Sequence, residues 1–260
     1  SSSLYKITPL RYFLEFSYKG TAYHGWQRQP NSSTVQQQME DALNTLLGKE
    51  TAVVAAGRTD TGVHAKQMFA HVDLALNVKE VEQLMHRLNK FLPYDITVND
   101  IHPVKADAHA RFDAMSRSYV YHLVQHKDPF SHEFSYTFTT KIDLNVMNAA
   151  AKLLLSHTNF KCFSRSKTDV KTYDCKVTEA YWEQLDYEWI FHISANRFLR
   201  NMVRAIVGTL IDVGTGKLSL ADFQAILKSE DRSKAGSSAP AHGLFLSQVQ
   251  YPNTIFEING

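Results

Sequence analysis

Short apolar runs and helical stripes alternate along the N-terminal part of the chain. Aromatic and β-branched residues between polar or Gly-containing segments predict strands at 11–18, 51–56, 67–74 and 96–101. The spacing of apolar residues predicts a helix that begins after Ser33 as its N-cap and ends at Gly48. A second helix follows Asn77 and Glu80, which have the spacing of a capping box, and ends before Pro93. The predicted order is therefore β-α-β-β-α-β.

The C-terminal part of the chain repeats this order loosely. Apolar runs predict strands at 116–125, 160–163, 177–185, 189–194 and 244–251, and helical patterns predict helices at 144–155, 198–213 and 220–227. Two copies of a split β-α-β unit predict an α+β fold in which two ferredoxin-like halves form one mostly antiparallel sheet, with helices on one face. We place the halves at residues 1–107 and 108–260 and expect the active cleft between them.

Composition narrows the class of protein. Of the 260 residues, 44% are hydrophobic and 21% are charged, which is ordinary for a folded chain of one large or two small domains. Cys162 and Cys175 have no C-x-x-C spacing, so a disulfide framework is excluded and a reducing compartment is favoured. No apolar run approaches the length of a membrane-spanning helix, so we expect no membrane association.

Positive charge is concentrated in two places, although the net charge is only +2. The first cluster contains the basic residues Lys161, Arg165, Lys167, Lys171 and Lys176. The second contains Arg197, Arg200 and Arg204, and on the predicted helix these arginines would share one face. Either cluster alone is explained as a solvated surface. Two such clusters interleaved with aromatic residues favour a surface that binds a polyanion.

The most unusual segment is the loop at residues 56–65, AGRTDTGVHA, between two predicted strands. Gly57 and Gly62 permit turns that other residues resist, and Asp60 lies between them with Arg58 two residues away. A plain β-hairpin loop with an Asx turn would account for Asp60 alone. The loop is longer than a two-residue hairpin needs, which favours a catalytic carboxylate whose ionised form a nearby arginine stabilises.

Other chemistries find weaker support. Residues 214–217, GTGK, lack the first glycine and the final Ser or Thr of a phosphate-binding loop. The 12 histidines show no metal-ligand spacing with a third ligand nearby, and neither G-x-S-x-G nor G-x-G-x-x-G occurs. One carboxylate in a tight loop and a row of arginines, without a metal or cofactor motif, suit an isomerisation or a glycosyl-bond reaction on an anionic polymer.

Five segments follow one another along nearly the whole chain, at 18–29, 57–65, 109–112, 196–208 and 239–244. In composition and order they resemble the motifs of the tRNA pseudouridine synthase A family. The resemblance implies the pseudouridine synthase fold and the conversion of uridine to pseudouridine at positions 38, 39 and 40 in the anticodon arm of tRNA. It also implies that no cofactor or metal is used, and that the protein is a cytoplasmic homodimer in which one tRNA contacts both subunits.

The resemblance implies roles for individual residues as well. The family's nucleophile falls on Asp60, and its base-stacking tyrosine falls on Tyr119. Arg204 matches the arginine that pairs with the catalytic carboxylate. Arg58 matches the arginine linked with base flipping, and Leu244 an apolar contact under the target base. We assign the RNA-binding surface to the basic residues Lys161, Arg165, Lys167, Lys171, Arg197 and Arg200.

The chain departs from the family's pattern at Lys19, Thr61 and Cys162, where Asp, Ala and a small hydroxyl residue are usual. The carboxylate of Asp60 can add to the base at C6, attack the sugar or deprotonate it, and the sequence favours none of these. A non-catalytic tRNA-binding protein would use the same basic surface without needing Asp60. A glycosidase would need a second acid within roughly 5–9.5 Å of the first, and no second acid occurs in a comparable loop.

Overall fold

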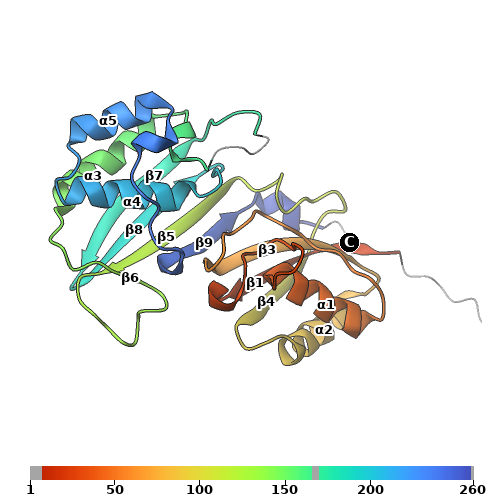
Figure 1. The fold of residues 1–260 in the computed structure, drawn as a ribbon. Helices are drawn as coiled ribbons and strands as arrows, with labels where there is room; N and C mark the ends of the chain where they lie inside the picture. Colours follow the sequence, from red (N-terminus) through yellow and green to blue (C-terminus); the bar gives the residue numbers. More distant parts are fainter. Residues whose placement is uncertain (1–7, 166–169, 259–260) are drawn as a thin grey trace, which may run out of the picture. The chain divides into compact units, whose positions relative to one another are not determined.

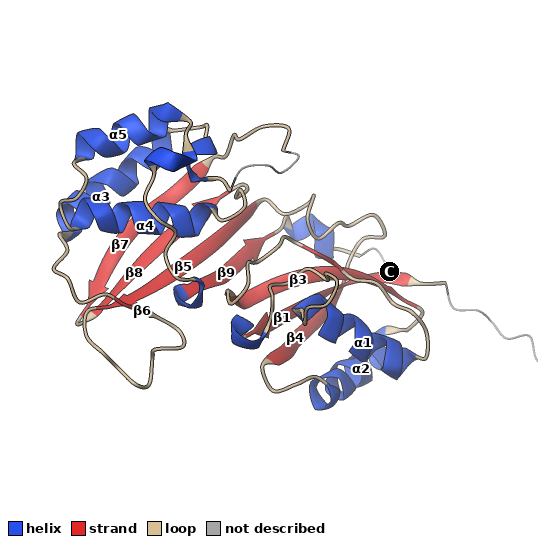
Figure 2. Ribbon diagram, in the orientation of Figure 1, coloured by secondary structure: helices blue, strands red, loops and turns tan. Residues whose placement is uncertain are grey.

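The computed structural model describes residues 8–165 and 170–258. These residues form two compact units. Unit 1 contains the described residues up to Met115 together with those from Gln248 onward, and unit 2 is Ser116–Ser247. Each unit combines mainly antiparallel strands with helices (Figures 1 and 2), which confirms the predicted α+β class.

Unit 1 follows the predicted order β-α-β-β-α-β. Its elements are β1 (Leu10–Tyr18), α1 (Val35–Leu47), β2 (Val54–Ala55), β3 (His64–Leu74), α2 (Val78–Phe91) and β4 (Ile96–Pro103). β1 is the middle strand and pairs antiparallel with both β3 and β4, so Leu14 lies opposite Ala70 on one side and Ile101 on the other. The short β2 pairs antiparallel with β3. α1 contacts α2, and α2 contacts β4 (Figure 1).

Local sequence signals set the helix ends of unit 1. The N-cap of α1 is Thr34, whose side chain accepts a hydrogen bond from the Gln37 amide, so the predicted cap at Ser33 is wrong by one residue. Gly48 ends α1 as predicted, because its left-handed φ of 70° suits a residue without a side chain. Asn77 and Glu80 form both hydrogen bonds of the capping box that the sequence predicts for α2.

In unit 2, β8 pairs antiparallel with β5 on one side and with β7 on the other. The chain reaches the start of β9 only after these three strands. The elements of unit 2 are β5 (Ser116–Val124), β6 (Tyr136–Thr137), α3 (Leu144–Leu153), β7 (Val177–Leu185), β8 (Glu188–Ala195), α4 (Met202–Gly214), α5 (Leu220–Ser229) and the start of β9 (Leu244–Gln250), whose residues from Gln248 onward belong to unit 1. The two-residue β6 pairs parallel with β5 and is too short for the sequence pattern to predict. α3 contacts β7, α4 and α5 (Figure 2).

The C-terminal residues belong to unit 1, whereas the sequence grouped them with the second half. The Met115 amide donates a hydrogen bond to the Gln250 carbonyl at 2.8 Å. The Tyr251 hydroxyl donates to the Ala110 carbonyl at 2.5 Å, and its ring packs against Phe13 and Phe69. These contacts extend unit 1 to Met115, beyond the boundary expected after residue 107, and add the end of the chain to it.

Two predictions for unit 2 are wrong. Residues 160–163 form no strand; Lys161–Phe163 is a short 3-10 turn, because Phe160 and Phe163 are both fully buried at a spacing of three residues and the alternation of a strand is absent. The helix predicted at 198–213 begins only at Met202. Asn201 has a left-handed φ of 66°, and a right-handed helix cannot continue through that conformation.

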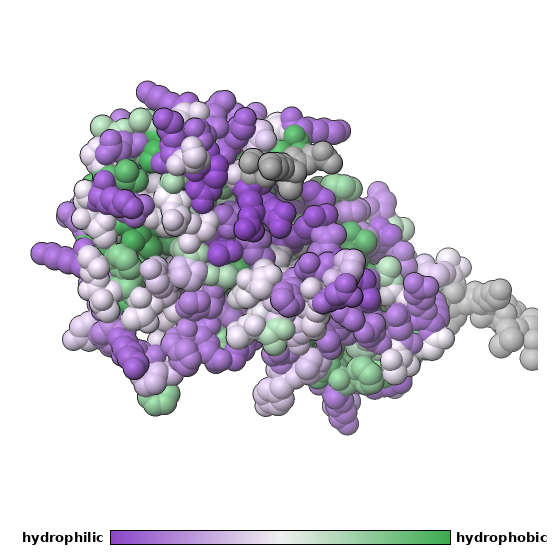
Figure 3. Space-filling view, viewed as in Figure 1, coloured by the Kyte–Doolittle hydropathy of each residue, from purple (hydrophilic) through white to green (hydrophobic). Residues whose placement is uncertain are grey.

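Each unit has its own core. In unit 1 the largest fully buried side chains are Tyr12, Phe13, Leu14, Phe16, Met39, Leu43 and Met68, and in unit 2 they are Tyr121, Phe160, Phe163, Phe191 and Phe223. On the face shown in Figure 3, hydrophilic residues cover most of the surface and hydrophobic ones form small separate patches. Over the part of the chain that the structure describes, no helix is long and apolar enough to cross a membrane.

Candidate active site

The Asp60 loop connects β2 to β3 in unit 1. The Val63 amide donates to the Asp60 carbonyl at 3.0 Å, which closes a tight turn, and Gly62 within this turn has a φ of 83° that favours glycine. Thr59 is buried, Asp60 is half-buried, and Arg58 is exposed. Asp60 therefore lies between a buried neighbour, Thr59, and an exposed neighbour, Thr61.

The segment that follows β1 is hydrogen-bonded to this loop at two points. The Trp26 amide donates to the Thr59 carbonyl, and the Gly62 amide donates to the Tyr23 carbonyl, both at 3.3 Å. Gly20 and Gly25 allow the close approach: a Cβ atom at Gly20 would lie 1.9 Å from the Val63 carbonyl oxygen, and one at Gly25 2.4 Å from that of Thr59. The motif at 18–29 and the motif at 57–65 therefore form one packed structure within unit 1.

Side chains fasten the same two segments. The Tyr18 hydroxyl lies 2.7 Å from Thr59 Oγ1 in a buried hydrogen bond. The Gly20 amide donates to Nδ1 of the buried His64 at 2.9 Å, so this nitrogen carries no proton. The Tyr23 hydroxyl donates to Asp95 at 2.6 Å, and burial together with this hydrogen bond raises the pKa of Tyr23. The Tyr23 hydroxyl therefore stays protonated and keeps its hydrogen bond to Asp95.

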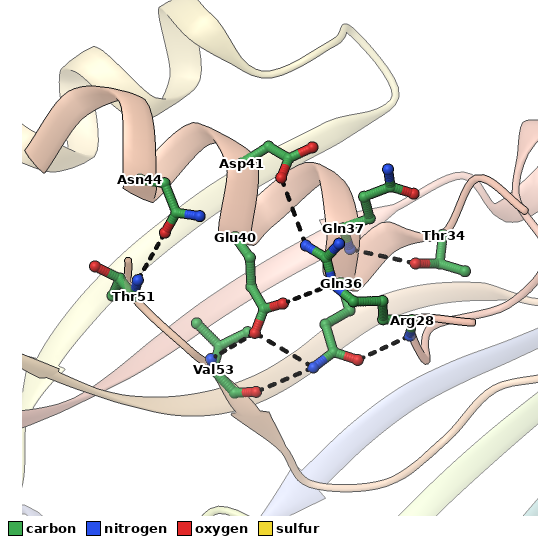
Figure 4. Close-up of polar contacts among 9 residues, drawn as sticks. All are labelled: Arg28, Thr34, Gln36, Gln37, Glu40, Asp41, Asn44, Thr51 and Val53. Atoms are coloured by element: carbon green, nitrogen blue, oxygen red, sulfur yellow. Dashed lines mark hydrogen bonds and ion pairs between the residues drawn. The ribbon is translucent and has the colours of Figure 1, made fainter. Parts of the chain in front are cut away.

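A buried carboxylate on α1 anchors the outer ends of both segments (Figure 4). Glu40 accepts hydrogen bonds from the Arg28 guanidinium and from the Val53 amide, each at 3.0 Å. Arg28 is the second-last residue of the motif at 18–29, and Val53 precedes β2. The arginine of this motif thus has a structural partner, and the stem of the Asp60 loop is tied to the helix beside it.

Tyr119 lies on β5 in unit 2, opposite Ile193 of β8. Its ring contacts Phe198 edge to face, with centroids 5.0 Å apart and planes at 86°. Tyr119 is half-buried and lies on the same strand face as Tyr121, which is fully buried. A rigid strand and an aromatic neighbour therefore hold the ring, while part of it stays accessible for stacking.

Arg204 lies in the first turn of α4 and is bound to the segment before β9. Its Nε donates to the Ala239 carbonyl, and the Ala239 amide donates back to the Arg204 carbonyl, both at 2.9 Å. The Tyr121 hydroxyl donates to the Pro240 carbonyl at 2.7 Å, and burial raises the pKa of Tyr121. Leu244 begins β9 and is 5% exposed. The motif containing Arg204 and the motif containing Leu244 therefore meet within unit 2.

The basic clusters are less uniform than the sequence suggests. Because α4 begins at Met202, Arg197 and Arg200 lie outside it, and the expected row of arginines on one helix face is wrong. Arg197 donates to the carbonyls of Thr172 and Asp174 and so joins the two clusters. The residues Arg165, Lys171 and Arg200 are exposed, and Lys161 lies 5.5 Å from the Tyr173 ring. Lys167 lies outside the described residues.

The predicted site residues are divided between the two units. Asp60 and Arg58 come from unit 1, and Tyr119, Arg204 and Leu244 come from unit 2. The contacts given above hold the Asp60 loop, Tyr119 and Arg204, each within its own unit, and the pairing of Asp60 with Arg204 stays a prediction. Among residues 8–165 and 170–258, no group of His, Cys, Asp or Glu side chains is arranged to hold a metal ion.

The motifs alone did not predict which residues position the Asp60 loop. Tyr18, Tyr23, Thr59 and His64 all lie in the motifs at 18–29 and 57–65, but the order of the motifs does not indicate which side chains meet. The signal that was present is the pair Gly20 and Gly25, because glycines at two points of one segment indicate a close approach by another chain segment.

Comparisons with known proteins agree with the motifs. A family model described as tRNA pseudouridine synthase matches residues 16–113 and 150–252. A protein from Porphyromonas gingivalis named tRNA pseudouridine synthase A is 53% identical over 249 residues, which cover 95% of this chain and 99% of the relative. Proteins of the same name from Bacteroides fragilis and Chlorobium luteolum are 50% and 38% identical, over 95% and 92% of this chain and 98% and 95% of the relatives.

An α+β fold with a carboxylate on an anchored loop, together with these matches, defines the class: the protein is a pseudouridine synthase, an RNA-modifying isomerase. Within that class, the chain belongs to the tRNA pseudouridine synthase family. The family predicted from the five motifs is therefore confirmed. The roles of single residues stay predictions.

Proposed function

We propose that this protein converts uridine to pseudouridine at positions 38, 39 and 40 in the anticodon arm of tRNA, with Asp60 as the nucleophile. The observation that supports this most directly is the Asp60 loop itself. The main chain on both sides of Asp60 is hydrogen-bonded to the segment that follows β1, so the carboxylate is presented from a rigid turn. Reactive groups need such preorganisation.

The reaction needs no external reactant. The bond between ribose C1′ and N1 of the base breaks, a bond between C1′ and C5 forms, the proton leaves C5, and N1 gains one. Nothing is oxidised or hydrolysed, so a carboxylate and proton donors suffice. Asp60 would act by addition at C6, by attack on the sugar or by deprotonation of the sugar, and each route keeps the same overall balance.

The other predicted residues serve the base after it leaves the stack, a step that costs a few kcal/mol. Tyr119 offers a stacking surface of the kind worth roughly 1–3 kcal/mol per base. Arg58 is exposed and can fill the vacated space, Leu244 supplies an apolar contact under the base, and Arg204 would pair with the Asp60 carboxylate.

Tritium release from tRNA labelled at uridine C5 tests the reaction, because only chemistry at C5 releases the label. Asp60→Asn should abolish release and leave tRNA binding within a few-fold, since the amide keeps the shape but is neither nucleophile nor base. Asp186→Asn is a matched control, because Asp186 lies in an exposed turn with a φ of 54° that asparagine also tolerates. Near-normal turnover of Asp60→Asn would remove Asp60 from the mechanism.

A non-catalytic tRNA-binding protein is the alternative that the basic residues alone would allow. Such a protein would bind tRNA without releasing tritium, and Asp60→Asn would change nothing. Under either function, affinity should fall by roughly 0.7–0.9 log units per phosphate contact for each tenfold rise in salt. The proposal further includes a cytoplasmic homodimer that contacts one tRNA with both subunits, and sedimentation with and without tRNA tests this stoichiometry.

A further inference from the structure

Tyr18 is in direct contact with the residue that precedes the proposed nucleophile. It ends β1, is 4% exposed, and its hydroxyl lies 2.7 Å from Oγ1 of Thr59, which is 8% exposed. Thr59 is held at its main chain as well, where its carbonyl accepts from the Trp26 amide. The residue before Asp60 is therefore fixed at both its side chain and its backbone.

Tyr18 lies on a strand that is paired on both sides. β1 is the middle strand of the unit 1 sheet, and Tyr18 pairs with Ala65 of β3 on one side and Ile96 of β4 on the other. The Tyr18 ring stacks near Phe16 at a centroid distance of 6.1 Å. A hydroxyl on a central strand has little freedom to move, so the hydrogen bond transmits the position of the sheet to the loop.

A second tyrosine on the same strand separates positioning from simple stability. Tyr12 is 1% exposed, and its hydroxyl donates to the Leu76 carbonyl at 2.7 Å, at the other end of β1. Tyr12 and Tyr18 thus lose the same group in a similar environment when changed to phenylalanine. Only Tyr18 contacts the Asp60 loop through that group.

We infer that Tyr18 is a positioning residue for this reaction: through Thr59 its hydroxyl sets the direction in which the Asp60 carboxylate points. The inference rests on the proposed role of Asp60. A misplacement of about 1 Å at a reacting group can reduce turnover roughly 100-fold, whereas the loss of one buried hydrogen bond lowers the stability of a protein only modestly. Catalysis should therefore be far more sensitive than folding.

The experiment compares kcat, KM and melting temperature for Tyr18→Phe and Tyr12→Phe, with tritium release as the assay. Tyr18→Phe should lower kcat roughly 10- to 100-fold and leave KM within about threefold. Both variants should lower the melting temperature by a similar amount, because each loses one buried hydroxyl. Tyr12→Phe should keep the kcat of the wild type. Thr59→Ser, which retains a hydroxyl, should keep most of the activity that Thr59→Val loses. The double variant Tyr18→Phe/Thr59→Val should be no slower than the slower single variant, because the two single changes remove the same hydrogen bond.

Equal kcat values for Tyr18→Phe and Tyr12→Phe would overturn the inference, and so would additive losses in the double variant. A failure of the proposed function would look different. The wild-type protein would then release no tritium, or Asp60→Asn would remain active. If Tyr18→Phe does not fold, Thr59→Ser against Thr59→Val tests the same hydrogen bond from its other end.

Discussion

Units 1 and 2 hold their candidate functional residues in different ways. In unit 1, Asp60 lies on a loop, and its position depends on hydrogen bonds from segments that are distant in the sequence. In unit 2, Arg204 lies on α4, a helix whose residues are almost all buried, and its position depends mainly on the packing of that helix. The position of a residue on a loop is fixed only as well as the segments that contact the loop, whereas close packing of the core fixes the position of a residue on a buried helix.

The two units also share one device. In each unit, a backbone carbonyl oxygen lies so close to a glycine that a side chain at that position would collide with it. A Cβ atom at Gly20 would lie 1.9 Å from the Val63 oxygen, and one at Gly208 on α4 would lie 1.8 Å from the Ser237 oxygen. The first contact supports the Asp60 loop, and the second supports the segment before β9.

The largest expected effect comes from filling these two contacts. Gly20→Ala and Gly208→Ala should each lower the free energy of unfolding by about 1–3 kcal/mol or more, because a backbone oxygen must move. Gly48→Ala is the control: it has the left-handed φ of 70° but no atom within 4 Å of its Cβ, so it should cost about 1 kcal/mol. Urea unfolding measures all three. If Gly20→Ala costs no more than Gly48→Ala, the backbone of the Asp60 loop can move away from the new side chain at little cost in free energy.

Acid should weaken unit 1 through His71. Its Nδ1 accepts from the Ala110 amide at 3.0 Å, and burial, with the nearby Arg11 and His109 charges, lowers the pKa of His71 to about 4. The unfolded chain has a histidine pKa of about 6.5 and takes up the proton first, so stability falls as the pH drops from about 6.5 to 4. The slope is at most about 1.4 kcal/mol per pH unit.

His71→Gln keeps an acceptor without titrating, and urea midpoints between pH 7 and pH 4 compare it with the wild type. The variant should lose part of the acid sensitivity. Hydrogen exchange at low pH should show the amides near Ala110 opening before those of α4. An unchanged acid slope in His71→Gln would assign the sensitivity to other groups.

Tyr121→Phe tests how unit 2 holds the segment before β9. It removes the hydrogen bond to the Pro240 carbonyl and should cost about 1 kcal/mol of stability. If packing dominates in unit 2, turnover should fall less than tenfold, well below the loss expected for Tyr18→Phe. Steady-state kinetics on both variants makes the comparison. A larger loss for Tyr121→Phe would reverse the contrast between the units.

The smallest effects belong to the capping boxes, where the units do not differ. Asn77→Ala on α2 and Ser219→Ala on α5 each remove the side chain that caps the helix, and with it one of the two hydrogen bonds of the capping box. Each should cost about 1 kcal/mol in urea unfolding, because the interaction is local. Costs that differ by more than about 1 kcal/mol would show that tertiary packing reaches these helix ends.

Local interactions explain what could be predicted from the sequence. The capping box at Asn77 and Glu80 and the end of α1 at Gly48 depend on residues within one helical turn, so their signals are complete in the sequence. The Asp60 loop was predictable as well, because two glycines and two flanking strands mark it. The family could also be predicted, because the order of five motifs is a property of the sequence and does not depend on tertiary contacts.

Only the tertiary structure decided how those motifs are used. Asn201 takes a left-handed conformation that begins α4 late, which moves Arg197 off the helix and onto the carbonyls of Thr172 and Asp174. The Tyr18 contact with Thr59 joins residues 41 positions apart, and the end of the chain returns to unit 1. Such contacts depend on where folding brings distant segments together. Residue spacing therefore predicts the helices, strands and loops, and packing determines which of them position the carboxylate.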